Sequence, residues 1–122
     1  MNRRWGVSIS WFGHATVLYT DVQGRNYLVD PWIEKNPASP PAARALARLD
    51  AIFVTHGHSD HFGDVMRLAA KHECEIVCIH EIYQYLGRKG VEKVQGMNKG
   101  GTIEVAGVKA TMVHAIHSSS IV

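Results

Sequence analysis

Three histidines and two aspartates are concentrated in the stretch "FVTHGHSDHFGD", residues 53–64. Imidazole and carboxylate ligands without a thiolate suit zinc, with iron or manganese as alternatives. His56 and His58 are two positions apart, so on an extended segment both point to the same side and can reach one cation. Asp60 and His61 follow at the expected start of a helix and face a second position beside the first. The spacing therefore predicts ligands for two neighbouring metals.

The alternative interpretation of this stretch is a solvent-exposed polar loop that happens to contain histidines. Its position at the end of an apolar strand, its ligand spacing and Gly57, which allows a tight turn between ligands, argue against that alternative. A second histidine pair, His114 and His117, follows later in the chain. On a strand, residues three apart face opposite sides, so both cannot easily reach one metal. We therefore expect His114 to be a buried or edge histidine, with a role as a metal ligand as the alternative.

The elements that must position these residues can be predicted from periodicity. Val7, Ile9 and Trp11 alternate with serines, which indicates a half-buried first strand. The predicted strands are 7–13, 15–20, 27–30, 51–55, 75–79, 91–95, 102–106 and 108–116, with a tight turn at Gly107 between the last two. The predicted helices are 42–49, 62–72 with Ser59 or Asp60 as its cap, and 80–90 closed by Gly87 or Gly90. A β-meander followed by strand–helix alternation predicts an α/β (α+β) fold with a mixed sheet.

Composition narrows the class of protein. The chain has 122 residues, which is enough for one domain, and its formal net charge is only +2. No dense basic run is present, so we expect no nucleic-acid partner. No apolar run reaches the roughly 18 residues of a membrane-spanning helix, and the first residues do not form a signal peptide, so we expect a cytoplasmic protein. Cys74 and Cys78 are expected to be reduced core thiols, because a strand would hold them about 13 Å apart.

The sequence resembles a known family at several short motifs. The stretch "HGHSDH" matches the H-x-H-x-D-H signature of the metallo-β-lactamase superfamily. The further stretches are "WFGHAT", "LVDPW", "THGHSDHFGD", "MNKGGT" and "HSSS". Together they resemble the superfamily's branch of small metal-dependent hydrolases and, more loosely, ascorbate-6-phosphate lactonase and the N-acyl-phosphatidylethanolamine-hydrolysing phospholipase D. The matches extend from Trp11 to Ser120.

The resemblance implies a ligand set by position. His56, His58 and His117 would bind the first metal, and Asp60 and His61 would bind the second and act in catalysis. The expected cofactor is zinc, two ions per complete domain, with manganese or iron as alternatives. Two metals about 3.5–4 Å apart can hydrolyse an ester, a lactone or a phosphodiester of a small molecule through a metal-bound hydroxide.

Two further residues receive roles near the metals from the same resemblance. Asp30, at the end of "LVDPW", would support the ligand loop from behind, and His14 of "GHAT" would lie near the pocket. A serine nucleophile is then unnecessary. We expect Ser118, Ser119 and Ser120 to support His117 rather than to react.

The resemblance also implies a partial domain. Residues 1–122 would form the N-terminal half of an αββα sandwich, with a mixed sheet and helices on one face. An aspartate bridging both metals and a final histidine would lie in a missing second half. The sheet would then expose an apolar face open to self-association. Two other functions stay open: a non-catalytic metal-binding module, and an iron-dependent oxidoreductase relative.

Overall fold

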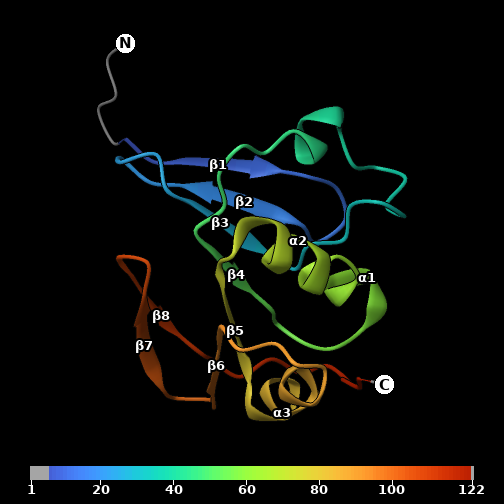
Figure 1. Cartoon of the computed structure of the whole chain (residues 1–122), viewed down its shortest axis with the longest axis vertical. Helices are drawn as coiled ribbons and strands as arrows, with labels where there is room; N and C mark the ends of the chain where they lie inside the picture. Colours follow the sequence, from blue (N-terminus) through green and yellow to red (C-terminus); the bar gives the residue numbers. More distant parts are fainter. Residues whose placement is uncertain (1–5, 122) are drawn as a thin grey trace.

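A single mixed sheet organises the chain in the computed structural model, which describes residues 6–121. Its strands are β1 (Ser8–Trp11), β2 (Val17–Thr20), β3 (Asn26–Val29), β4 (Ala51–Phe53), β5 (Glu75–Ile79) and β6 (Val94–Met97). They lie side by side in sequence order (Figure 1). Strands β1 to β3 form the antiparallel meander, and β3 to β6 pair in parallel. The predicted mixed sheet of an α/β fold is confirmed.

The helices cover one face of this sheet and bury its central residues. They are a 3-10 turn (Pro41–Arg44), α1 (Ser59–Phe62), α2 (Val65–His72) and α3 (His80–Arg88). Leu28, Ile52 and Ile76 point toward the helices from neighbouring strands, and each is fully buried. Alternate strand residues and a helical stripe thus form one core, as expected for helices on one face. Among the described residues, no helix is both long enough and apolar enough to cross a membrane.

Helix α3 shows how local sequence ends an element. Gly90 has a φ of 84°, a left-handed conformation that glycine adopts at little cost. The Gly90 N–H donates to the carbonyl of Gly87, and the Val91 N–H donates to the carbonyl of Leu86. This pattern is a Schellman motif. Of the two glycines predicted to close the helix, Gly90 therefore does so.

The opposite face of the sheet is only partly covered. Strands β7 (Thr102–Val105) and β8 (Val108–Thr111) form a separate hairpin, and Val105 packs with Tyr27 and Val77 of the sheet. At the β1 end, Ile9 is 70% exposed and Trp11 is 67% exposed. The prediction of a half-buried first strand was therefore wrong in its burial, because no described residues cover those side chains. An exposed apolar sheet face results.

Three local predictions were also wrong. The helix expected at 42–49 is only the 3-10 turn Pro41–Arg44, because the chain then runs toward β4 and the carbonyl of Arg48 accepts a hydrogen bond from Asn26. The strand expected at 108–116 ends at Thr111, so His114 lies exposed in an irregular segment. Neither Ser59 nor Asp60 caps the helix after the histidine loop: α1 begins after His58, without a side-chain capping bond.

Candidate metal centre

The loops at one edge of the sheet bring the predicted site residues together. Asp30 follows β3, and the histidine loop follows the parallel neighbour β4. His14 lies in the turn between β1 and β2, which opens at this same edge because Val17 pairs with Val29. Parallel strands place their carboxyl ends together, and ligands bind there in open α/β sheets.

The first cluster consists of His56, His58 and His117. The ring centroid of His56 lies 4.7 Å from that of His58 and 4.7 Å from that of His117. The ring centroids of His58 and His117 lie 5.2 Å apart. One ring nitrogen from each histidine lies within 4.8 Å of the other two. Three imidazoles around one point are a ligand set that zinc accepts, with room for a fourth ligand. The structure therefore brings together the three residues predicted for the first metal.

Gly57 allows the segment that carries His117 to approach the histidine loop. A Cβ added at Gly57 would lie 2.2 Å from the carbonyl oxygen of Ser120, far inside contact distance. The Gly57 N–H donates to Ser119 Oγ at 3.3 Å. The φ of Gly57 is not positive, so glycine is needed here for close packing. The predicted tight turn between ligands is not the reason.

The second cluster consists of His14, Asp60 and His61. His14 Nε2 lies 3.0 Å from Asp60 Oδ2, and His61 Nε2 lies 3.8 Å from Asp60 Oδ1. One donor atom from each residue falls within 4.8 Å of the others. Burial disfavours the Asp60 carboxylate, but the hydrogen bond from its own backbone, the neighbouring His61 and His14 lower its pKa below the ordinary 3.8. Asp60 is therefore a carboxylate at neutral pH, as a metal ligand requires.

A buried carboxylate behind both clusters fixes the orientation of two histidines. Asp30 Oδ1 accepts a hydrogen bond from the Thr55 N–H at 2.7 Å, and Oδ2 accepts one from the Thr55 hydroxyl at 2.5 Å. His61 Nδ1 lies 2.8 Å from Asp30 Oδ2, and His56 Nδ1 lies 2.9 Å from Thr55 Oγ1. The Thr55 hydroxyl has one proton, which it gives to Asp30, so His56 Nδ1 must donate to Thr55. Both histidines are then protonated on Nδ1, and the lone pair of Nε2 is available to a metal.

The hydrogen bonding and protonation of His56 show whether these residues fit a metal ion. Its Nε2 is buried and has no hydrogen-bond partner among the described residues, which is costly for a polar atom unless a ligand binds it. Burial, followed by the neighbouring His61, lowers the pKa of His56 below 6.5. The ring is therefore neutral at pH 7, the form that binds metals. Donor chemistry and the unpartnered nitrogen both fit a metal.

Sequence reasoning missed three residues that build this site. Thr55 connects Asp30 to His56, as described above. Thr16 is fully buried, donates to the Asp30 carbonyl at 2.7 Å and accepts from the Trp32 N–H at 3.1 Å, so it joins "GHAT" to "LVDPW". Asp64 is buried and accepts the Ile33 N–H at 2.6 Å. All three lie inside the stretches "GHAT" and "THGHSDHFGD" that carry the family resemblance, but the sequence does not indicate which distant groups they bind.

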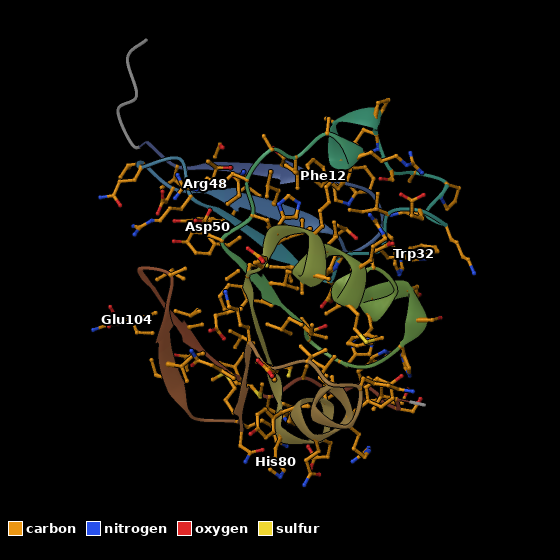
Figure 2. All side chains as sticks on the ribbon, in the orientation of Figure 1. Phe12, Trp32, Arg48, Asp50, His80 and Glu104 are labelled. Carbon is orange, nitrogen blue, oxygen red and sulfur yellow. The ribbon has the colours of Figure 1, made fainter. Side chains whose placement is uncertain are left out.

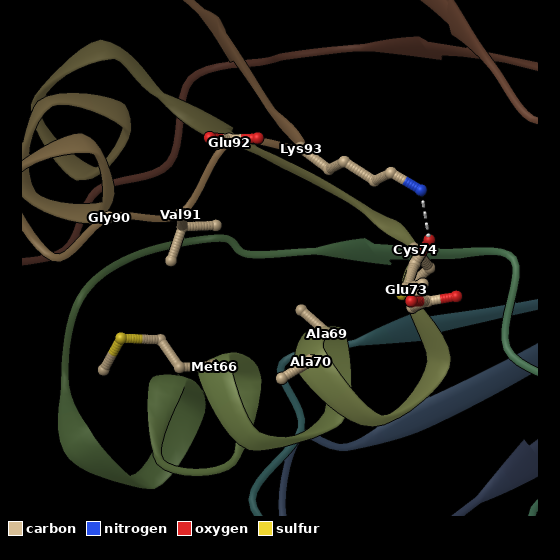
Figure 3. A pocket seen from close by; sticks show the side chains of 9 residues that line it. All are labelled: Met66, Ala69, Ala70, Glu73, Cys74, Gly90, Val91, Glu92 and Lys93. Carbon is tan, nitrogen blue, oxygen red and sulfur yellow. Dashed lines mark hydrogen bonds between the residues drawn. The ribbon is translucent and has the colours of Figure 1, made fainter.

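Two cavities differ in their relation to the metal centre. An open cavity of about 590 Å³ borders the ligand loop and is lined in part by His58, Asp60 and Ile121. Another, of about 320 Å³, lies between α2 and the segment before β6, where Lys93 donates to the Glu73 carbonyl (Figure 3). Its one thiol, Cys74, has a pKa raised to about 11 by burial and is a poor nucleophile. The first cavity is therefore the candidate substrate site.

Comparison with known families identifies the class of protein. The family model described as a β-lactamase superfamily domain matches residues 25–121. A metal-dependent hydrolase of Koribacter versatilis is 45% identical over 116 residues, which is 95% of this chain and 50% of that protein. A metal-dependent hydrolase of Methanosarcina mazei is 48% identical over 115 residues, which is 94% of this chain and 48% of that protein. The chain therefore belongs to the β-lactamase superfamily, as its motifs indicate.

Solved structures agree with this assignment. A metallo hydrolase from the archaeon Ignicoccus hospitalis superposes with a TM-score of 0.81 at 31% identity, covering 93% of this chain and 50% of that one. A metallo-β-lactamase from Cronobacter sakazakii superposes with a TM-score of 0.58 at 23% identity, covering 85% of this chain and 49% of that one. The second likeness concerns the fold alone. The chain spans about half the length of the curated relatives it matches.

Proposed function

We propose that this chain carries the metal-binding residues of a hydrolase that uses two zinc ions to cleave an ester, lactone or phosphodiester bond of a small molecule. The observation that carries the proposal is the pair of adjacent donor clusters joined by one buried carboxylate. Asp30 contacts His61 of the second cluster directly and reaches His56 of the first through Thr55. Relatives named metal-dependent hydrolases support the same function.

The chemistry follows from what each side chain does. When bound, a metal pair supplies Lewis acidity and a water nucleophile at neutral pH. Asp30 and Thr55 hold the Nε2 lone pairs of His56 and His61 toward the metal positions. The cavity beside His58 admits a substrate next to the ligands. Ser119 Oγ accepts a hydrogen bond from the backbone of the ligand loop, which gives it a structural task.

Hydrolysis assays of the zinc-loaded chain test this proposal. We expect turnover of a nitrophenyl phosphodiester, a nitrophenyl ester or a lactone, abolished by chelation and restored by zinc. The same turnover should be lost in His56→Ala and kept in His80→Ala, because His80 is exposed on α3 and stacks on Tyr83. Turnover that survives both chelation and His56→Ala would contradict the proposal.

The alternative functions give different results in the same preparation. Zinc bound in full with no turnover of any of the three bonds would favour a non-catalytic metal-binding module. This alternative is worth testing because the chain spans about half the length of its relatives. Iron bound in preference to zinc would favour an oxidoreductase relative. A single truncated domain, a cytoplasmic location, the absence of a nucleic-acid partner and self-association through the exposed face of β1 remain predictions.

A further inference from the structure

We propose that His14 is itself a ligand of the second metal, completing a three-donor site with Asp60 and His61. This inference rests on the proposed metal-dependent function and deepens it. The family resemblance gave the second metal only two ligands in this chain and placed His14 merely near the pocket. In the structure, a nitrogen of His14 lies with donor atoms of Asp60 and His61 in one group.

The distances in this group suit a shared cation. A tetrahedral site with bonds of about 2.0–2.1 Å separates neighbouring donor atoms by roughly 3.3 Å. His14 Nε2 lies 3.0 Å from Asp60 Oδ2, and Asp60 Oδ1 lies 3.8 Å from His61 Nε2. These two separations, one to each oxygen of the Asp60 carboxylate, lie on either side of the ideal value. Because His61 Nδ1 is occupied by Asp30, the Nε2 atom of His61 is the one that faces the shared position.

The backbone holds His14 at this place. His14 has a φ of 53°, a left-handed conformation that is uncommon outside glycine and is found at functional sites. The preceding Gly13 also has a positive φ, and a Cβ there would lie 2.8 Å from the backbone of Ala38. Trp11 Nε1 donates to the His14 carbonyl at 2.8 Å. The turn is thus packed and hydrogen-bonded in the conformation that presents the ring to Asp60.

Neighbouring rings also limit how the imidazole can move. The His14 ring centroid lies 5.4 Å from that of Trp32 and 5.1 Å from that of His61, in edge-to-face arrangements. The side chain is still partly open to solvent. A ring held on two sides, with its Nε2 at the edge of an accessible site, is in the position of a metal ligand.

One other role would use the same geometry. His14 could act as a positioning residue that donates a hydrogen bond to Asp60 Oδ2 and leaves Oδ1 for the metal. Glutamine at position 14 separates the two roles, because its amide places an N–H donor near the Nε2 position but is a weak zinc ligand. Alanine removes both properties.

Metal stoichiometry and cobalt absorption provide the test. After dialysis against zinc, we expect two equivalents in the unaltered chain and in His80→Gln, and one equivalent in both His14→Gln and His14→Ala. In the cobalt-loaded His14 variants, the absorption bands of the second site should be lost and those of the first site should remain. Two equivalents and an unchanged cobalt spectrum in His14→Gln, with loss only in His14→Ala, would overturn the ligand role in favour of positioning.

A measurement on the unaltered chain removes any dependence on how the variants fold. With nitrogen-15-labelled histidine, the second-site cadmium resonance should couple to two imidazole nitrogens, those of His14 and His61. Coupling to one nitrogen would overturn the inference while leaving the proposed function intact. A chain that binds no zinc or cadmium would overturn both.

Discussion

Replacing Asp30 with asparagine should weaken metal binding without unfolding the chain. Asparagine matches aspartate in shape, and its remaining oxygen can accept the Thr55 N–H as Oδ1 does now, at 2.7 Å. The new amide nitrogen then replaces Oδ2, which accepts from the Thr55 hydroxyl and faces His61 Nδ1. The amide N–H of the new asparagine would then face the N–H on His61 Nδ1, and two donors cannot form a hydrogen bond. His61 must therefore move its proton to Nε2, the atom that the metal needs.

The size of the expected loss of zinc affinity follows from the role of Asp30, which orients a metal-binding histidine. Loss of a carboxylate that orients a metal-binding histidine reduces metal affinity by about 10–100-fold, equivalent to roughly 1.4–2.7 kcal/mol. We expect a loss toward the upper end, because Asp30 is only 2% exposed and serves both clusters. Competition against a chromophoric zinc chelator measures the change.

Asp50→Asn is the matched control. Asp50 precedes β4 and accepts the Asn26 N–H at 2.8 Å, so it is also a partly buried, hydrogen-bonded aspartate. Figure 2 shows it at the end of the sheet opposite Trp32, which lies beside the metal centre. Its variant should bind zinc normally. Unchanged zinc affinity in Asp30→Asn, with circular dichroism showing a folded chain, would refute the orienting role.

Thr55→Val should weaken the first site about 10-fold by removing the hydroxyl relay, while Thr55→Ser keeps it; chelator competition compares the two. Gly57→Ala should weaken the same site, because its Cβ would lie 2.2 Å from the Ser120 carbonyl; zinc titration measures this. Burial lowers the pKa of His72 below 6.5, so below that pH the unfolded chain binds more protons and the free energy of unfolding falls until the folded pKa is passed. Urea denaturation of the metal-free chain between about pH 5 and 8 measures this dependence. The free energy of unfolding should change less steeply with pH in His72→Gln than in the unaltered chain. Ile9→Thr should reduce self-association in sedimentation experiments, whereas Met66→Gln on the helical side should not.

The sequence predicted most of what depends on local pattern. Alternation and apolar runs indicated a strand at or next to each strand of the six-stranded sheet, although β6 covers Val94–Met97 and not the predicted 91–95. The metal-ligand spacing after β4 identified the ligand loop. These features are periodic and short-range, so residues such as His56 and His58 could be recognised without knowing what packs against them.

What the sequence could not predict depends on contacts between distant segments. Thr55 and Asp64 look ordinary in sequence, and their roles arise only when other segments fold against them. The importance of Gly57 was predicted, but its reason, close packing against Ser120, depends on such a contact as well. The burial of Trp11 was mispredicted for the same reason: alternation shows which side chains share a face, and only tertiary packing decides whether that face is covered.

Anomalous X-ray scattering at the zinc edge, from crystals of the zinc-loaded chain, tests the central claim most directly. We predict two peaks about 3.5–4 Å apart, one among His56, His58 and His117 and one beside Asp60 and His61. Peaks elsewhere on the molecule, or none at these histidines, would contradict the account of a two-metal centre at this edge of the sheet.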